Sequence, residues 1–113
     1  MKRPSGGKAP RAKGDRFERA IVKLLQDKGL GAERVPLSGS AGGSYVGDIG
    51  VSCPCLGRDL VVEAKARADG FSQLYQWLQD RDVLVVKADR RDALVVIPLK
   101  LAVEILAAAE MRK

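Results

Sequence analysis

Segment 60–66 combines an apolar strand pattern with two opposite charges, Glu63 and Lys65. Its Val and Leu content is typical of a buried strand, in which charged side chains are rare. Side chains alternate between the two faces of a strand, so Glu63 and Lys65 project from one face and the apolar side chains from the other. An acid and an amine are therefore presented side by side on a rigid support.

The preceding segment 47–52 has the same alternation. Asp48 shares one face with Gly50 and Ser52, whereas the apolar side chains of this segment belong to the other face. If the two strands pair, Asp48, Glu63 and Lys65 converge on one polar edge above a common apolar face. This edge is the candidate active site.

The rest of the chain predicts an α/β domain with a central sheet between helices. The expected order is α-β-β-β-α-β-β-α. Helices are expected over 15–28, 70–80 and 101–111, and strands over 33–37, 46–52, 58–66, 83–87 and 93–98. A loop is expected at 38–44, and turns at 53–57 and 89–92. Leu74, Trp77 and Leu78 share one side of the second helix, which predicts that Trp77 lies in the core. The alternative for Tyr75 and Trp77 is a dimer interface.

The 113 residues suffice for one domain, and their 46% hydrophobic and 30% charged content is that of a globular protein. The net charge of +6 favours an acidic partner, and residues 1–19 carry seven basic side chains against two acidic ones. Segment 1–13 is predicted to be a disordered basic arm that tracks phosphates or only aids solubility. Segment 14–113 is predicted to be the single domain.

Several classes of function are disfavoured by what the chain lacks. No apolar run approaches the ~20 residues that span a bilayer, and no secretory leader is recognisable, so a cytoplasmic protein without a membrane partner is expected. Aromatic content of 4% argues against base stacking, and the absence of histidine excludes imidazole catalysis. Cys53 and Cys55, without other soft ligands, are interpreted as small residues of a turn and not as a zinc site.

Carboxylates and one lysine remain for chemistry. Acidic oxygens on adjacent strands suit a hard divalent cation such as Mg²⁺, which lowers the pKa of a bound water and polarises a phosphate oxygen. Lys65 could orient or deprotonate that water, or neutralise charge in the transition state. In a basic chain this set indicates phosphodiester hydrolysis. The alternative is that Glu63 and Lys65 form only an ion pair, which is the better explanation of an isolated Glu-x-Lys.

Asp48 in a Gly-Asp-Ile segment, followed by Glu63-x-Lys65, resembles the PD-(D/E)xK nuclease superfamily. Within it the chain is most similar to archaeal-type Holliday junction resolvases, including relatives carried by phages. The similarity begins at the helix 13–25 and covers nearly all of the chain after residue 12. Gly47 stands where the motif has proline. The resemblance implies a restriction-endonuclease-like fold, with a central mixed sheet flanked by helices.

The resemblance also implies roles for individual residues. Glu18, Asp48 and Glu63 would bind or organise the metal, with Lys65 beside them. DNA contacts would come from Arg19, Arg34, Ser38 and Ser40. From the residues alone, Glu18 is an ordinary surface glutamate at the border of the apolar stripe. Members of the family are homodimers that cut a four-way DNA junction symmetrically.

The sequence therefore predicts an endonuclease, dependent on Mg²⁺ with Mn²⁺ as a substitute, that resolves four-way junctions by paired nicks. It would act in the cytoplasm of a prokaryotic or phage-infected cell. One alternative is a general DNA nuclease of the same superfamily. Another is a module of nuclease-like fold that binds branched DNA or RNA without cutting it, and a partner-binding protein without nucleic-acid contact is least favoured.

Overall fold

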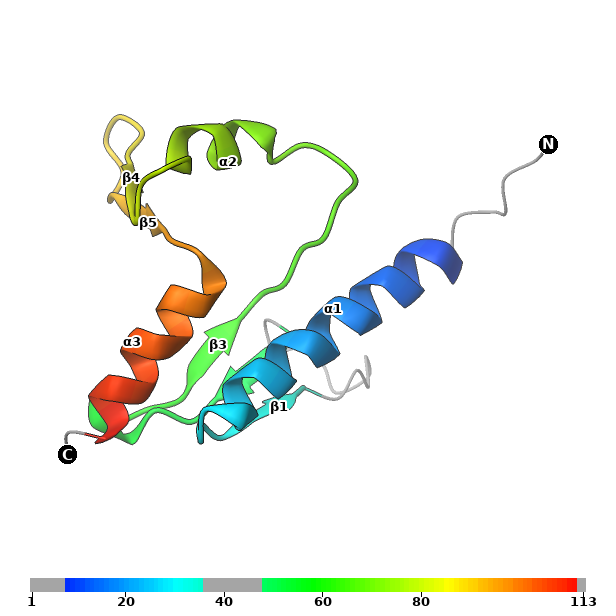
Figure 1. Ribbon diagram of the computed structural model, residues 1–113, viewed down its shortest axis with the longest axis vertical. Coiled ribbons are helices and arrows are strands. Elements are labelled where there is room, and N and C mark those ends of the chain that lie inside the picture. The colour runs from blue at the N-terminus through cyan, green and yellow to red at the C-terminus, as the bar shows by residue number, and fades with distance from the viewer. Residues whose placement is uncertain (1–7, 36–47, 112–113) are drawn as a thin grey trace.

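The computed structural model describes residues 8–35 and 48–111, with side chains described from residue 13 onward. The elements follow in the order α1 (Lys8–Asp27), β1 (Ala32–Arg34), β2 (Ile49–Val51), the 3-10 turn η2 (Pro54–Leu56), β3 (Leu60–Val62), α2 (Ser72–Leu78), β4 (Leu84–Val86), β5 (Leu94–Val96) and α3 (Leu99–Met111) (Figure 1). The predicted order of helices and strands is confirmed, as is the α/β class. The strands are shorter than predicted, with three residues each.

Strands β1, β2 and β3 form an antiparallel sheet with β2 in the centre. Gly50 of β2 lies opposite Glu33 of β1 and Val61 of β3. The predicted apolar face of β2 is confirmed, because Ile49 and Val51 are fully buried. The turn predicted at 53–57 is present as η2, so the two cysteines lie at the connection between β2 and β3.

Helix α1 packs against β1 through an apolar stripe that includes the buried Ile21 and Leu25. The helix ends before Gly29, which has a φ of +85°, a conformation that glycine adopts without strain. Its first residue is Lys8, so residues 8–13 of the predicted disordered arm are helical. Segment 1–7 lies outside the described residues.

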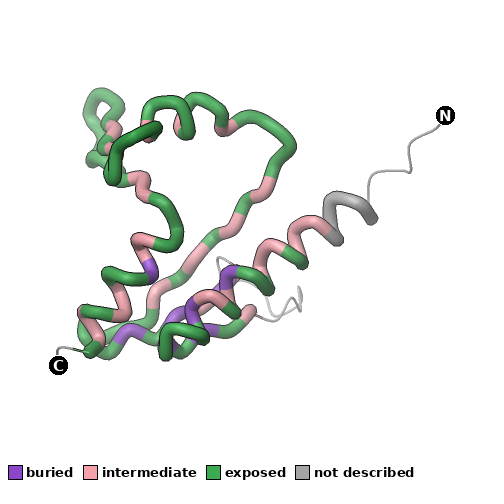
Figure 2. Tube along the Cα trace, in the orientation of Figure 1, coloured by how far each residue is buried: buried purple, intermediate pink, exposed green. Residues whose placement is uncertain are grey.

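The core lies between α1, the three-stranded sheet and α3 (Figure 2). Its members are apolar and buried: Ile21, Leu25, Leu30, Ala32, Ile49, Val51 and Val103. Helix α3 contributes Val103 and also contacts η2. The core therefore holds β2 in place, and the predicted active site lies at the start of this strand.

The last two strands do not join this sheet. β4 and β5 form their own antiparallel hairpin, so the described strands make two sheets in place of one central mixed sheet. Their pairing is local, since a short turn with Arg90 in the left-handed region (φ +63°) connects them. Segment 63–71, in contrast, leads away from β3 to α2 (Figure 1).

Helix α2 lies beside this hairpin at the far end of the molecule (Figure 1). It contributes no buried residue, and Trp77 is 52% exposed. The prediction that Trp77 lies in the core is therefore wrong: its helix has an apolar side, but the structure places no sheet against it. Within the described ranges, no helix has the length and apolarity needed to cross a membrane.

Candidate active site

Asp48 is tied to both neighbouring strands at the start of β2. Its backbone N–H donates to the carbonyl of Val62 at 2.8 Å, and its own carbonyl accepts the N–H of Val35 at 2.9 Å. Its side-chain Oδ2 accepts the backbone N–H of Ala64 at 2.8 Å. The carboxylate is therefore held next to the residue that separates Glu63 from Lys65.

Glu63 and Lys65 project from the same face of the chain that continues β3, as predicted. Residues 61, 63 and 65 are exposed, whereas 62, 64 and 66 are partly buried. Glu63 Oε2 lies 3.2 Å from Lys65 Nζ, with 54% and 57% of the two side chains exposed. An ion pair at this exposure contributes at most about 1 kcal/mol to stability. Both groups can therefore leave this pair to contact a ligand.

Hydrogen bonds between β2 and β3 relate Asp48 to Glu63. The last pair of the ladder is Ile49 with Val62, and the backbone N–H of Asp48, one residue earlier, donates to the carbonyl of Val62. Glu63 follows Val62 directly in the chain. The folding of β2 on β3 thus brings the acidic residue of one strand to the Glu-x-Lys segment of the other.

Glu18 is held elsewhere, by Arg34 of β1. Arg34 Nε donates to Glu18 Oε1 at 3.0 Å, and the same guanidinium donates to Asp15. The hydrogen bond to Asp15 is the largest cause that raises the pKa of Arg34, and the hydrogen bond to Glu18 is the next, because both carboxylates stabilise its cation. Asp15 is not among the site residues predicted from the sequence. Its spacing of three residues from Glu18, which places both on one helix face, is the signal that could have found it.

The three predicted metal ligands have suitable chemistry, but the structure does not bring them close together. Carboxylate oxygens are the ligands that Mg²⁺ prefers, and water completes its shell. Among the described residues, however, the one group of three candidate ligands within 4.8 Å of one another does not include Glu18, Asp48 or Glu63. A metal at this edge would therefore draw the side chains of Glu63 and Glu18 inward.

The predicted DNA contacts are placed in part. Arg19 is exposed on α1, whereas Arg34 is engaged with the two carboxylates of that helix. Ser38 and Ser40 lie outside the described residues. The structure adds a basic hollow at the β4–β5 hairpin, lined in part by Lys87, Arg90 and Arg91. The sequence pattern predicts only a turn in this region, and the density of basic residues is the signal that could have indicated a binding surface.

Comparison with known proteins identifies a family for this chain. Residues 9–111 match the family described as archaeal Holliday junction resolvase. No curated protein and no solved structure was found to match the chain. The family match extends over nearly the whole chain, from the first helix through Asp48 and the Glu-x-Lys segment to the last helix. The chain therefore belongs to the archaeal Holliday junction resolvase family.

Proposed function

We propose that this protein is a metal-dependent, structure-specific endonuclease that resolves four-way DNA junctions by paired nicks. One observation carries the proposal: in a chain of the resolvase family, the Asp48 carboxylate is hydrogen-bonded to the backbone between Glu63 and Lys65. This contact holds the Asp48 carboxylate next to the segment that carries a second acid, Glu63, and an amine, Lys65.

Asp48 and Glu63 would hold the cation, Mg²⁺ or Mn²⁺ in its place. When bound, such an ion supplies Lewis acidity and a water of lowered pKa. Asp48 is the fixed ligand, because its backbone and Oδ2 are already hydrogen-bonded. Glu63 is the adjustable one, since more than half of its side chain is exposed. Glu18 would join them only after its contact with Arg34 changes.

Lys65 would act on the phosphate. Its ammonium group lies on the same face as Glu63 and is more than half exposed, so it can reach a substrate that approaches this edge. A protonated amine there binds a non-bridging phosphate oxygen and stabilises the charge that grows in the transition state. The substrate would thus replace the Glu63–Lys65 ion pair with two separate contacts.

Phosphates away from the cut would be bound by basic side chains on α1 and on the β4–β5 hairpin. Arg19 on α1 is exposed, and the β4–β5 hairpin presents Lys87, Arg90 and Arg91. Further candidates are Ser38, Ser40 and the segment 1–7, all outside the described residues. Because the substrate is DNA, we expect the protein to act in the cytoplasm of a prokaryotic or phage-infected cell.

Paired nicks require two active sites, and each chain supplies one candidate edge, so we expect a homodimer. Large apolar side chains that remain exposed on α2 and the hairpin are available for a partner copy: Tyr75, Trp77, Val85, Leu94 and Val95. Their burial in a dimer would supply the cover that the single chain does not give them.

The deciding experiment compares a fixed four-way junction with a linear duplex of the same sequence, with Mg²⁺ and with chelator. We expect paired nicks in opposed strands of the junction, only with the metal. Glu63→Gln should abolish cleavage and retain junction binding, whereas Glu104→Gln, an exposed change on α3, should cut normally. Equal cutting of both substrates would identify a general nuclease.

A second function is favoured by the spacing of the acids. The described carboxylates of Glu18, Asp48 and Glu63 do not form a three-ligand group within 4.8 Å, as expected of a module that binds branched DNA without cutting it. Such a module would bind the junction as tightly as a resolvase but leave it intact with Mg²⁺ and with Mn²⁺. The same assay therefore distinguishes the two functions.

A further inference from the structure

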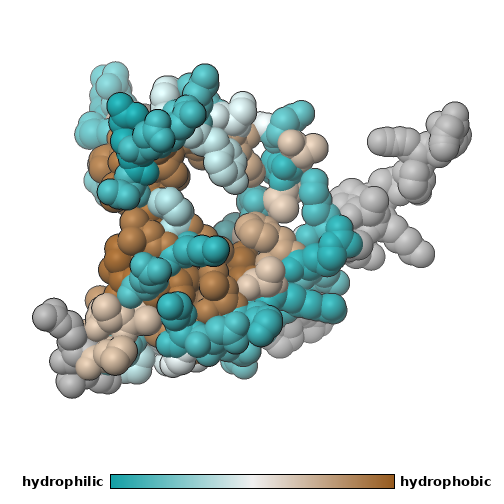
Figure 3. All heavy atoms as spheres, in the orientation of Figure 1, coloured by the Kyte–Doolittle hydropathy of each residue, from teal (hydrophilic) through white to brown (hydrophobic). Residues whose placement is uncertain are grey.

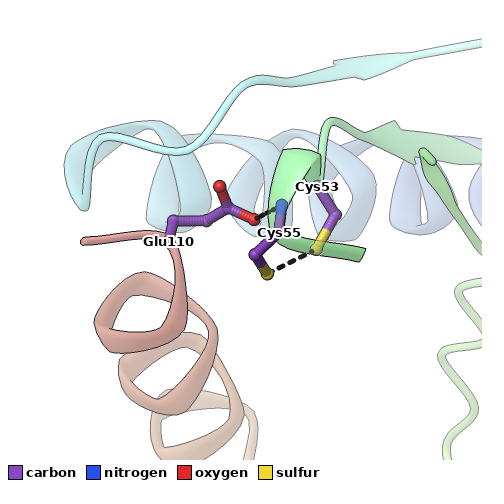
Figure 4. A group of neighbouring side chains, drawn as sticks. All are labelled: Cys53, Cys55 and Glu110. Atoms are coloured by element: carbon purple, nitrogen blue, oxygen red, sulfur yellow. Dashed lines mark hydrogen bonds between the residues drawn. The ribbon is translucent and has the colours of Figure 1, made fainter. Parts of the chain in front are cut away.

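Cys53, Cys55 and Glu110 meet where the β2–β3 connection contacts the end of α3 (Figure 4). The two Sγ atoms are 3.5 Å apart, and the backbone N–H of Cys55 donates to Glu110 Oε2 at 3.0 Å. Both sulfurs and a carboxylate oxygen lie within 4.8 Å of one another. Cys53 is fully buried and Cys55 is exposed.

Local backbone structure fixes the two thiols on one side of the turn. Pro54 begins η2, and hydrogen bonds from Leu56 N–H to Cys53 O and from Gly57 N–H to Pro54 O, both 2.9 Å, close it. Gly57 ends the turn with a φ of +77°, which favours glycine. The fold alone adds the third group, because Glu110 is 55 residues away in sequence from Cys55.

We propose that these three residues bind a thiophilic divalent cation, Zn²⁺, that clamps the end of α3 to the β2–β3 connection. Two sulfurs at about 2.3 Å from a tetrahedral zinc lie roughly 3.7 Å apart, close to the spacing observed here. A disulfide would require about 2.05 Å. Cys53, Cys55 and Glu110 thus offer two thiolate ligands and one carboxylate, with water as the fourth ligand.

Ion binding would remove a proton from each thiol and release both to solvent, and the cation would balance the new negative charge.

This site is distinct from the candidate active site. Asp48 precedes β2 and Cys53 follows it, so the two lie at opposite ends of the strand, five residues or roughly 16 Å apart. The ligand chemistry also differs, since thiolates select Zn²⁺ where carboxylates alone suit Mg²⁺. The prediction that the cysteines only fill a turn was made without the carboxylate that α3 supplies.

The test is titration of the reduced, metal-free full chain with Co²⁺ as a spectroscopic substitute, followed by competition with Zn²⁺. We expect one tetrahedral Co²⁺ per chain with a thiolate charge-transfer band, displacement of Co²⁺ by Zn²⁺, and release of about two protons per ion. Stoichiometric Zn²⁺ should also raise the melting temperature by several degrees, because it binds only the folded chain. Absence of the charge-transfer band, or two thiols that are lost as a disulfide in the freshly isolated protein, would overturn the proposal.

Single substitutions test which residues bind the ion. Cys55→Ser, at an exposed position, should lower the intensity of the charge-transfer band by about half or more, and Glu110→Gln should weaken Zn²⁺ binding by about tenfold or more. Glu104→Gln on the same helix and Asp48→Asn at the active site should bind Zn²⁺ as the unaltered chain does. Circular dichroism at a temperature well below melting checks that each variant is folded. A band that keeps its full intensity in Cys55→Ser, or that is lost in Asp48→Asn, would refute this site.

Discussion

The part of the chain built on β1–β3 and the part built on the β4–β5 hairpin differ sharply in burial. Every buried residue that the structure describes belongs to α1, to the chain from Leu30 to Cys53, or to α3. Val51 in β2 is 1% exposed, whereas Val85 in β4 is 61% exposed, although both are strand valines. The first part thus has a core of its own and carries Asp48. The second part depends on cover from elsewhere.

The boundary between the two parts is visible as an opening in the space-filling view, with apolar side chains along the body beside it (Figure 3). Contacts between apolar surfaces on both parts would release water and stabilise the molecule. Binding of a second copy of the chain or of a DNA junction could bring these surfaces together. Four predictions separate what each part contributes.

The largest effect is expected at Asp48. Asp48→Asn should lower junction cleavage by about a thousandfold or more, because the amide is a much poorer metal ligand. The amide oxygen can still accept the N–H of Ala64, so the melting temperature should change little. Asp89→Asn, a matched change in the β4–β5 turn, should retain full cleavage. Single-turnover cleavage rates check both variants, and equal loss in both would place catalysis outside the β2–β3 edge.

The next effect concerns stability. Val51→Ala removes two methyl groups from a fully buried site and should lower the free energy of unfolding by about 2 kcal/mol. Val85→Ala removes the same groups from an exposed site and should change it by less than about 0.5 kcal/mol. Urea unfolding at low protein concentration measures both. If Val85→Ala proved as costly as Val51→Ala, the hairpin would already be packed in the free chain.

A smaller effect is expected from the basic hairpin. Replacing Lys87, Arg90 and Arg91 together by Gln should weaken junction binding and make its dependence on salt shallower by up to about three units in log–log slope. The same variant should keep the melting temperature, since all three side chains are exposed. Junction affinity measured at four or more salt concentrations gives the slope. An unchanged slope would show that DNA does not reach this part of the molecule.

The smallest effect belongs to the N-terminus. Because α1 begins at Lys8, deletion of residues 1–7 removes Lys2 and Arg3 without shortening the helix. The salt slope of junction binding should fall by up to about two units if both charges meet phosphates. Lys2→Gln with Arg3→Gln in the full-length chain is the matched control for the charges alone. No change in either variant would make the segment a passive tail.

Local patterns were sufficient to predict much of this molecule. The alternation in 48–53 and 60–66 gave the buried face of the sheet and the common face of Glu63 and Lys65, because strand geometry fixes both. The apolar stripe of α1 was equally readable. These features depend only on neighbours a few residues apart.

What escaped prediction depends on contacts between distant segments. The pairing of Arg34 with Asp15 and Glu18, and the approach of Glu110 to Cys55, follow from how helices settle on the sheet. The separation of the β4–β5 hairpin from the first sheet has the same origin. A strand pattern shows which residues can form a ladder, but it does not show which partner strand is chosen.

The three hydrogen bonds of Asp48 fix its position relative to the two neighbouring strands. A residue that ties β1, β2 and β3 together through its main chain cannot slip along the strand without unpairing both neighbours. Insertions or deletions close to this position should therefore abolish folding and catalysis at once, while similar changes in the β4–β5 turn should spare the fold. In a library of length variants selected for stability alone, the spacing between Asp48 and the Glu-x-Lys segment should survive unaltered.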